Sequence, residues 1–335
     1  MKIRIAIQAA LLLTFVGSTA FAGSENKTGT AGAPELAIPI GTRGVALGGS
    51  VIASPSGLES IYWNPAGLAS LDATSTTFCH QPYLADMSMD FFGIATNIEG
   101  FGSLGGSVRV LSVGDIEETT EAQPEGTGRI YNPTLSVVSI TYATNLTTAV
   151  AFGLNASFIH ESVFEASASG MGFDFGVTYE PQWKGWTMGL AIKNIGPKMT
   201  YSGAGFDRRF ESGGQRTFTP KAAPFELPSS IKIGLANKFM NRDMHTATVT
   251  SSFVAHQFSP DAWHGGVEYG YNERYYLRGG YVVSTGSGES EDLYGASLGI
   301  GLNIPVGHSI LEFGYAWSET KVFDDNQFIS LGLSF

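Results

Sequence analysis

Cysteine, charge and long apolar runs are all scarce in this chain of 335 residues. The one cysteine, Cys79, cannot form an internal disulfide, and it lies too far along the chain to be a lipoprotein acylation site. Only 15% of the residues are charged, whereas soluble domains usually carry about 25%. Beyond residue 22, no apolar run approaches the roughly 18 residues that a membrane-spanning helix requires. The chain is therefore either an all-β soluble protein or a protein whose strands meet lipid.

Motifs of metal binding and catalysis are missing as well. The six histidines lie at positions 80, 160, 245, 256, 264 and 308 and show neither H-x-x-H nor H-E-x-x-H spacing, so we expect no zinc site. The glycine-rich runs fall within expected strands and lack the following helix that phosphate-binding and dinucleotide-binding loops require. We therefore expect neither a cofactor nor an enzyme.

The first 22 residues have the features of a secretory signal peptide. Lys2 and Arg4 precede an apolar stretch, and Ala20-Phe21-Ala22 forms an A-x-A cleavage site before Gly23. We expect a mature protein that begins at Gly23 and has been exported across an inner membrane. Loss of Lys2 and Arg4 changes the formal net charge from −11 to −13, so nucleic acid is not an expected partner.

Apolar residues alternate with small or polar residues along much of the chain, which contains 43 Gly and 22 Phe. In residues 150–158 one face carries Val150, Phe152, Leu154, Ala156 and Phe158, and the other carries Ala151, Gly153, Asn155 and Ser157. This period of two predicts strands, and it recurs in residues 173–180, 231–236, 295–304 and 311–317. A soluble sandwich would have outer faces rich in Lys, Glu and Thr. A second face of Gly, Ala, Ser and Asn instead favours the crowded lumen of a membrane barrel, with the apolar face turned to lipid.

The alternating segments and their connections predict a fourteen-stranded barrel. The expected strands lie near residues 74–80, 87–97, 103–113, 134–143, 147–159, 169–180, 185–195, 229–239, 245–256, 262–271, 274–284, 293–304, 308–318 and 327–335. Short connections tend to alternate with longer or more polar ones, such as residues 114–133 and 196–227, as in barrels whose short turns face the periplasm. We therefore predict an all-β fold, a 14-stranded antiparallel transmembrane β-barrel in the bacterial outer membrane.

Aromatic residues and the last strand agree with this prediction. Two belts are expected at the membrane interfaces: Tyr142, Tyr179, Trp186, Tyr271 and Tyr275 near the short turns, and Tyr281, Tyr294 and Trp317 near the long loops. The chain ends on an alternating strand with Phe335, which resembles the signal read by the outer-membrane barrel assembly machinery. That machinery is an expected partner during biogenesis, and outer-membrane lipid is an expected partner afterwards.

The residues before the first strand have no clean period and are rich in Gly and Ala. A segment this apolar is not expected to hang in the periplasm, and a barrel of this strand number is too wide to be filled by its own side chains. We therefore predict an N-terminal lumenal plug, or hatch, over residues 23–72, followed by a barrel over residues 73–335.

Two motifs in this segment resemble the N-terminal signature of the PorV/PorQ family, relatives of the FadL-type outer-membrane channels for long-chain fatty acids. They are "GTRGVALGGS", residues 41–50, and "YWNPAGLA", residues 62–69. Asn64, Pro65 and Ala66 match the NPA motif in the hatch of that superfamily, and Gly67 permits the sharp turn that follows. We expect the Asn64 side chain to hold the turn and Pro65 to stiffen it. The resemblance implies a fourteen-stranded barrel closed by an N-terminal hatch.

The resemblance also implies a route for ligands. In FadL-type members, hydrophobic compounds bind inside the barrel and leave sideways into the membrane through a kink in the third strand. Gly105 and Gly106 lie in the expected third strand and are candidates for such a lateral gate, although glycine is common in nearly every strand of this chain. Tyr62 and Trp63 either pack the hatch against the wall or line an apolar binding slot.

A few charged residues are expected to point into the lumen, where an unpaired charge is costly. We expect Arg43 to pair with Asp174, Glu268 or Glu312, and the other inward cations are Lys193, Lys232 and Arg278. We interpret these residues mainly as contacts that fix the hatch to the wall.

Three functions fit these expectations. The first is a passive outer-membrane channel for small hydrophobic molecules such as fatty acids. The second is an outer-membrane component of type IX secretion, in which the loops at 114–133 and 196–227 form a docking surface for secretion-system proteins. The third is a structural barrel with neither role.

Overall fold

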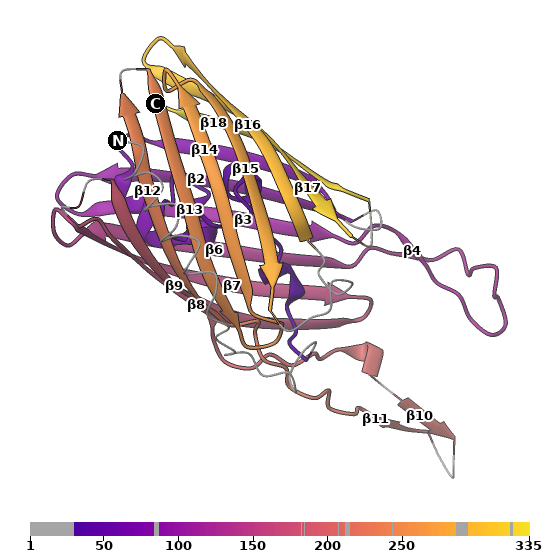
Figure 1. The fold of residues 1–335 in the computed structure, drawn as a ribbon. Coiled ribbons are helices and arrows are strands. Elements are labelled where there is room, and N and C mark those ends of the chain that lie inside the picture. The colour runs from indigo at the N-terminus through magenta and orange to yellow at the C-terminus, as the bar shows by residue number, and fades with distance from the viewer. Residues whose placement is uncertain are drawn as a thin grey trace.

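The computed structural model describes residues 30–335 except 84–86, 182, 184, 207, 212–214, 243, 286–293 and 322–323. The expected signal peptide lies outside the described residues. Within the described part of the chain, fourteen antiparallel strands close into one barrel (Figure 1). Each strand pairs with its neighbour in the chain, and β1 closes the barrel against β18. The predicted fold class is confirmed.

The wall strands follow the predicted ranges to within a few residues. They are β1 (Ser75–Pro82), β2 (Ser88–Ile98), β3 (Gly102–Ser112), β6 (Thr134–Asn145), β7 (Val150–Val163), β8 (Ala166–Tyr179), β9 (Trp186–Ile195), β12 (Ser230–Arg242), β13 (His245–His256), β14 (Ala262–Tyr271), β15 (Tyr275–Ser284), β16 (Tyr294–Val306), β17 (Ser309–Thr320) and β18 (Asn326–Ser334). Two hairpins in the long loops were not predicted. β4 (Ile116–Glu117) pairs with β5 (Ile130–Tyr131), and β10 (Arg208–Glu211) pairs with β11 (Gln215–Phe218).

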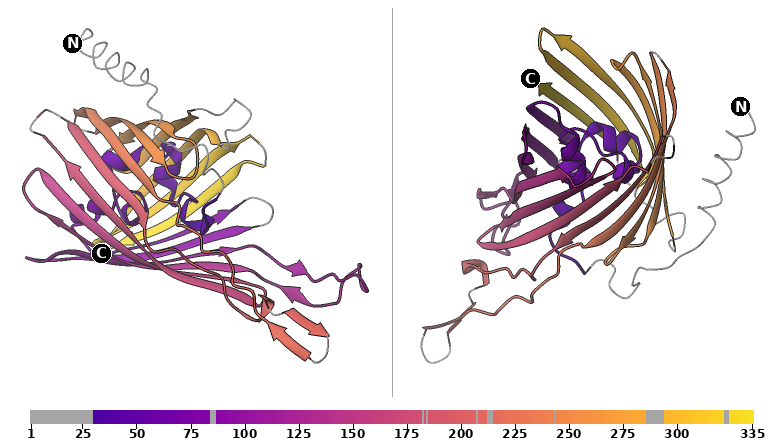
Figure 2. Two further views of the ribbon diagram at one scale, coloured as in Figure 1. Left: turned by 90° about the horizontal axis from the view of Figure 1, so that it is seen from below. Right: turned by 90° about the vertical axis from the view of Figure 1, so that its left-hand side faces the viewer.

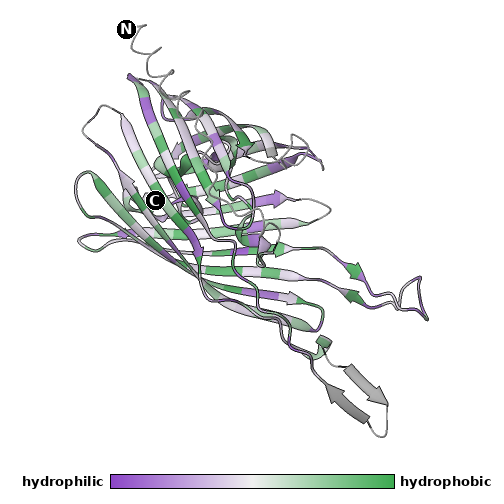
Figure 3. Cartoon of the chain, turned by 60° about the horizontal axis from the view of Figure 1, so that its bottom comes forward, coloured by the Kyte–Doolittle hydropathy of each residue, from purple (hydrophilic) through white to green (hydrophobic). Residues whose placement is uncertain are grey.

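The two faces of the wall differ as the alternation predicts. In β16 the side chain of Leu298 is 59% exposed, while that of its neighbour Ser297 is 2% exposed because it points into the barrel. Exposed Ile, Leu, Val and Phe recur on the outer face of the strands, and green and purple segments alternate along many of the wall strands in Figure 3. An apolar outer surface of this extent is stable in lipid and not in water. No helix in the described residues is long and apolar enough to cross a membrane.

The segment before β1 folds into five short helical turns that lie inside the barrel (Figure 2). They are η2 (Pro34–Leu36), α2 (Thr42–Ala46), η3 (Val51–Ala53), α3 (Ser60–Trp63) and η4 (Pro65–Ser70). Glycines with positive φ, including Gly41, Gly48 and Gly49, interrupt the segment and keep each helix short. The main buried cluster joins this segment to the wall: Leu47, Ile52 and Trp63 pack with residues such as Phe91 and Phe328. We call residues 30–72 the hatch.

Candidate functional site

The NPA turn links two hatch helices to the wall. The Asn64 side chain caps η4, because its Oδ1 accepts a hydrogen bond from the Ala66 N–H at 3.2 Å. Its Nδ2 donates to the Ile52 carbonyl at 2.7 Å and to the Val177 carbonyl of β8 at 3.2 Å. Pro65 occupies the first position of η4, where a missing N–H costs nothing. The motif therefore has a structural role: it fixes η3 and η4 against β8.

Inward-facing glycines of the wall form the seat of the hatch. Gly153 of β7 and Gly176 of β8 lie opposite each other, and both contact the NPA turn. A Cβ atom on Gly153 would lie 2.2 Å from the Pro65 carbonyl carbon, and one on Gly176 would lie 2.1 Å from Asn64 Oδ1. The same close approach recurs around the barrel at Gly105, Gly189, Gly234, Gly266, Gly280, Gly299 and Gly314. Part of the high glycine content thus serves contact between hatch and wall.

We expect the substitution Gly176→Ala to loosen the hatch, because the new methyl group would overlap the Asn64 side chain. Overpacking of this kind costs about 1–3 kcal/mol. The measurement is cleavage by chymotrypsin at Tyr62 and Trp63, which are buried while the hatch is docked. Gly265→Ala is the matched control, since no atom lies within 4 Å of a Cβ placed there. Equal cleavage rates in the two variants would show that the glycine seat does not hold the hatch.

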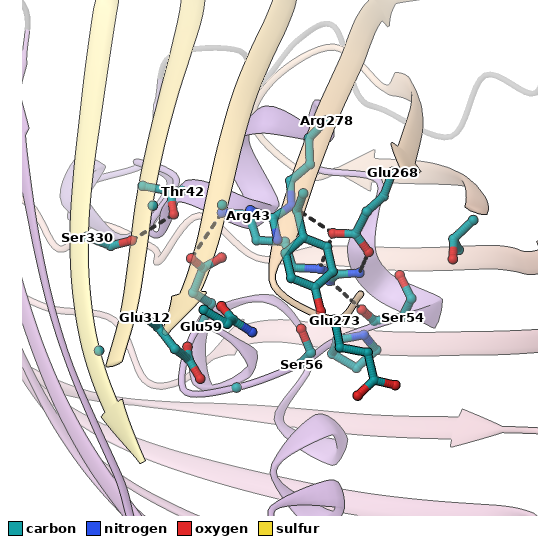
Figure 4. Close-up of a pocket in the computed structure, with 18 of the residues that line it drawn as sticks. Thr42, Arg43, Ser54, Ser56, Glu59, Glu268, Glu273, Arg278, Glu312 and Ser330 are labelled. Carbon is teal, nitrogen blue, oxygen red and sulfur yellow. Dashed lines mark hydrogen bonds and ion pairs between the residues drawn. The ribbon is translucent and has the colours of Figure 1, made fainter. Parts of the chain in front are cut away.

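A charged cluster joins the hatch to the wall (Figure 4), and it borders a cavity on the short-turn side of the barrel. Arg43 of α2 makes two bonds to Glu268 of β14, from Nε at 2.9 Å and from Nη2 at 3.0 Å. Arg278 of β15 donates from Nε to the same carboxylate at 2.7 Å. Arg43 Nη1 also donates to the Ser54 carbonyl at 2.7 Å. This two-pronged geometry is the strongest form of arginine–carboxylate pairing, and it joins the hatch to two wall strands.

Glu59 extends the cluster within the hatch. Its carboxylate accepts hydrogen bonds from the backbone N–H groups of Arg43 at 3.1 Å and Gly44 at 2.9 Å. Burial raises the pKa of the Glu59 carboxyl, and these two bonds with the nearby arginines oppose that shift. Glu59 thus closes the first turn of α2 and holds Arg43 in position.

The other predicted lumen carboxylates have different partners. Asp174 of β8 pairs with Lys193 of β9 at 2.6 Å and accepts a bond from Asn155 at 3.0 Å. Glu312 of β17 accepts a 3.5 Å bond from Ser334 and lines the same cavity as Arg43. That cavity measures about 640 Å³. Of the three carboxylates considered for Arg43, the structure therefore brings only Glu268 into contact with it.

Tyr62 and Trp63 pack tightly and also border open space. Their rings meet edge to face at 4.9 Å, Trp63 Nε1 donates to the Ile40 carbonyl at 2.9 Å, and the Tyr62 hydroxyl donates to the Ala37 carbonyl at 3.2 Å. Burial raises the pKa of Tyr62 well above its usual value, so its hydroxyl stays protonated. The Lys232 ammonium of β12 lies 5.6 Å from the Tyr62 ring centroid and 5.5 Å from that of Trp63.

The space beside these rings is a cavity of about 350 Å³ on the long-loop side of the hatch, which we call the upper cavity. Val45, Pro39 and Val282 line it together with Tyr62 and Trp63. Its polar lining includes His264, whose Nδ1 donates to the Gly48 carbonyl at 2.6 Å and whose buried Nε2 has no partner among the described residues. A mostly apolar cavity with a few polar atoms is the usual form of a small-molecule site.

Gly105 and Gly106 lie in an unbroken strand. β3 pairs with β2 and with β6 along its length without a shift of register. Gly105 faces the hatch, where a Cβ would lie 2.8 Å from the Leu68 side chain. The two glycines therefore belong to a regular ladder in this structure. A gate at these two glycines would require a conformation different from this one.

Sequence reasoning missed two features of the lumen. Glu35 of η2 is fully buried, and the segment around it has no period from which burial could be predicted. Lys193 was expected to point inward, but its place in a β-bulge depends on the register between β8 and β9.

Among the described residues, no group of three or more His, Cys, Asp or Glu is placed to hold a metal. Residues 295–299 spell G-x-S-x-G, but they lie within β16, and Ser297 donates to the Ala46 carbonyl.

A closed barrel with an apolar outer face and a folded segment in its lumen defines an outer-membrane protein of bacteria. The chain belongs to the PorV family, described as type IX secretion system protein PorV, which it matches over residues 21–220. The resemblance found in the sequence is thereby confirmed. Comparison with curated proteins finds no match.

Two solved structures show the same fold at low identity. The toluene transporter TodX of Pseudomonas putida is 15% identical, with a TM-score of 0.55, and the alignment covers 88% of this chain and 97% of TodX. A FadL homologue of Pseudomonas aeruginosa is 11% identical, with a TM-score of 0.51 and coverage of 88% and 97%. At these identities the similarity concerns the fold.

Proposed function

We propose that the protein binds small hydrophobic molecules in its lumen and lets them pass passively across the outer membrane. The upper cavity is the observation that carries this proposal, because its lining is mainly apolar and its volume of about 350 Å³ suits a small ligand. The fold is shared with a toluene transporter and with a FadL homologue, which supports the same role. Family and fold are those of transport proteins, and we infer that the chain is not an enzyme.

In this proposal the predicted plug of residues 23–72, of which the hatch is the described part, closes the barrel of residues 73–335 to water and ions. Two observations support it. The charged cavity of about 640 Å³ lies on the short-turn side of the hatch, and the upper cavity lies on the long-loop side. Between them the hatch is buried against the wall by the cluster that contains Leu47, Ile52 and Trp63.

The proposal predicts that filling part of the upper cavity weakens ligand binding. Val282 of β15 lines the cavity, so the substitution Val282→Trp would occupy part of the volume that a ligand needs. Its neighbour Val283 is 48% exposed on the outer face, and Val283→Trp is the matched control. We expect radiolabelled laurate to bind the wild type and the control in nanodiscs, and to bind Val282→Trp at least about tenfold more weakly. Equal binding by the two variants, or no binding by the wild type, would contradict the proposal.

A second function, as a docking component of type IX secretion, is favoured by the family match. The two loop hairpins extend well beyond the barrel in Figure 1, and the first exposes Ile116 and Ile130 among acidic residues. In this function secreted proteins would contact the hairpins and not the upper cavity. Proteins with a common C-terminal export domain would then co-purify with the barrel, and Val282→Trp would retain them.

A further inference from the structure

The ladder of the wall stops early between β8 and β9. Phe173 pairs with Ile195 and Phe175 with Ile192, so β9 carries one extra residue opposite Asp174. One pair, Phe173–Ile195, follows this bulge, and bulges also occur between β12 and β13 and between β16 and β17. On the long-loop side of Phe173, residues 166–172 of β8 still pair with β7 along their length. No residue of β9 pairs with them, because β9 ends at Ile195.

Buried polar contacts hold this bulge. Asn194 has a φ of 57°, and its backbone N–H donates to Asp174 Oδ1 at 2.7 Å. Lys193 Nζ donates to Asp174 Oδ2 at 2.6 Å, and both side chains are almost fully buried. Bulges bend a strand and end its regular pairing. The regular pairing of β8 with β9 therefore ends at this bulge.

Two loop segments, residues 196–202 and 225–229, cover the free edge of β8, and we call them the strap. A single antiparallel bridge joins the strap to β8: Ser167 and Ser202 exchange backbone hydrogen bonds of 2.8 and 2.9 Å. The two strap segments meet at a second bridge, between Met199 and Phe225, with two bonds of 2.9 Å. So few ladder bonds make this part of the wall easier to open than a paired strand.

The inner side of the strap is apolar and contacts the start of the hatch. Met199 and Leu227 are buried in a cluster with Leu36 of η2, Ile159 and Ala33. The backbone N–H of Gly32 donates to the Glu226 carbonyl at 3.1 Å. The strap and the first residues of the hatch are therefore packed as one unit, so a movement of one changes the contacts of the other.

A buried polar defect lies under the strap. Glu35 of η2 is fully buried, and neither of its carboxylate oxygens has a partner among the described residues. The Tyr201 hydroxyl of the strap donates a hydrogen bond to the carboxylate of Glu161 in β7. Glu161 is also the residue whose negative charge acts on Glu35. Burial, and then the charge of Glu161, raises the pKa of Glu35 to about 7. Unpaired buried groups of this kind lower the stability of the closed state.

Tyr62 is common to the linings of two cavities. Tyr62 lines the upper cavity and also a small cavity of about 30 Å³, which is bordered by Leu36, Lys193 and Asn194. Outside the wall at the same height, Phe158, Met171 and Ile195 are 46–50% exposed on the apolar outer face. A molecule that passed beneath the strap would thus enter lipid and not water.

We propose that the strap is a lateral gate, through which a hydrophobic molecule leaves the upper cavity past Tyr62 and enters the membrane between β8 and β9. This inference rests on the proposed function and places the exit away from β3, whose ladder is continuous. Displacement of the start of the hatch opens the gate, because Leu36 and Gly32 are packed against the strap.

A reversible cross-link tests the gate. In a Cys79→Ala background, the pair Ser167→Cys and Ser202→Cys places two thiols on directly bridged residues, about 5.5 Å apart at Cα, which a disulfide can span. The control pair, Ile116→Cys and Tyr131→Cys, joins two paired residues of the β4–β5 hairpin. We expect oxidation of the strap pair to lower laurate uptake by cells at least about tenfold, since the open state is removed, and dithiothreitol to restore it. The control pair should show no change.

Binding separates this inference from the function on which it rests. The oxidised strap pair should still bind laurate in nanodiscs, because the upper cavity is untouched. If the wild type binds laurate but uptake is the same in the oxidised and reduced strap pair, the gate lies elsewhere and the inference is wrong. If the wild type neither binds nor transports laurate, the proposed function itself is wrong, and the gate is rejected with it.

Discussion

Deletion of residues 30–70 is expected to convert the closed barrel into an ion-conducting pore. The inner face of the wall is lined by Gly, Ser and Ala where the hatch is seated, so these strands cannot fill the lumen with their own side chains. A fourteen-stranded barrel without internal filling is wide enough for water and ions. In planar bilayers the conductance of the deletion variant should exceed that of the wild type by more than about tenfold, because an open lumen replaces a packed one.

This experiment needs a control for folding and one for the loops. The variant should keep the heat-modifiable gel mobility of a folded barrel, whose compact unheated form migrates faster than the heat-denatured chain, which shows that the wall has closed. Replacing residues 116–131 by a short turn removes the β4–β5 hairpin, which lies outside the lumen, and should leave the conductance unchanged. A folded deletion variant with wild-type conductance would mean that the hatch does not close the channel.

The strands were predictable because the two faces of each strand lie in different environments, lipid on one side and the packed lumen on the other. In β7, Phe158 faces lipid and Ser157 faces the hatch, so alternation appears in the sequence wherever the wall separates lipid from a packed lumen. The β4–β5 and β10–β11 hairpins were missed because they lie beyond the barrel and have no such pair of environments. Their strands are also only two to four residues long, too short for a period to show.

The hatch was harder to predict in detail, for a physical reason. It is surrounded by protein on all sides, so residues such as Leu47 and Ile52 are buried without any periodic pattern. The sequence indicated that Arg43 needs a carboxylate but left three candidates, because strand height and register decide which one is in reach. The structure places Glu268 beside Arg43 and gives Asp174 to Lys193.

The substitution Glu268→Gln is expected to release the hatch from the wall. Glu268 is the common partner of Arg43 and Arg278, and the three side chains are 9–17% exposed. Neutralising the carboxylate removes the charge that both largely buried arginines bind directly, and removing one partner of a buried ion pair costs about 3–5 kcal/mol. Because the cluster borders a cavity, we expect the lower end of this range, about 3 kcal/mol. Cleavage by chymotrypsin at Tyr62 and Trp63 should then be faster by on the order of 100-fold, as 1.4 kcal/mol is a factor of ten.

Two further variants show whether the loss of pairing is the cause. Glu273 lines the same cavity but is exposed, so Glu273→Gln removes the same charge without breaking a buried pair, and its cleavage rate should match the wild type. The triple variant Arg43→Met, Glu268→Leu and Arg278→Met removes all three charges together. Since apolar residues can replace a buried ion network at little cost, the triple variant should regain most of the lost stability. If Glu268→Gln and Glu273→Gln were cleaved equally fast, the Arg43–Glu268–Arg278 cluster would not be what holds the hatch in the barrel.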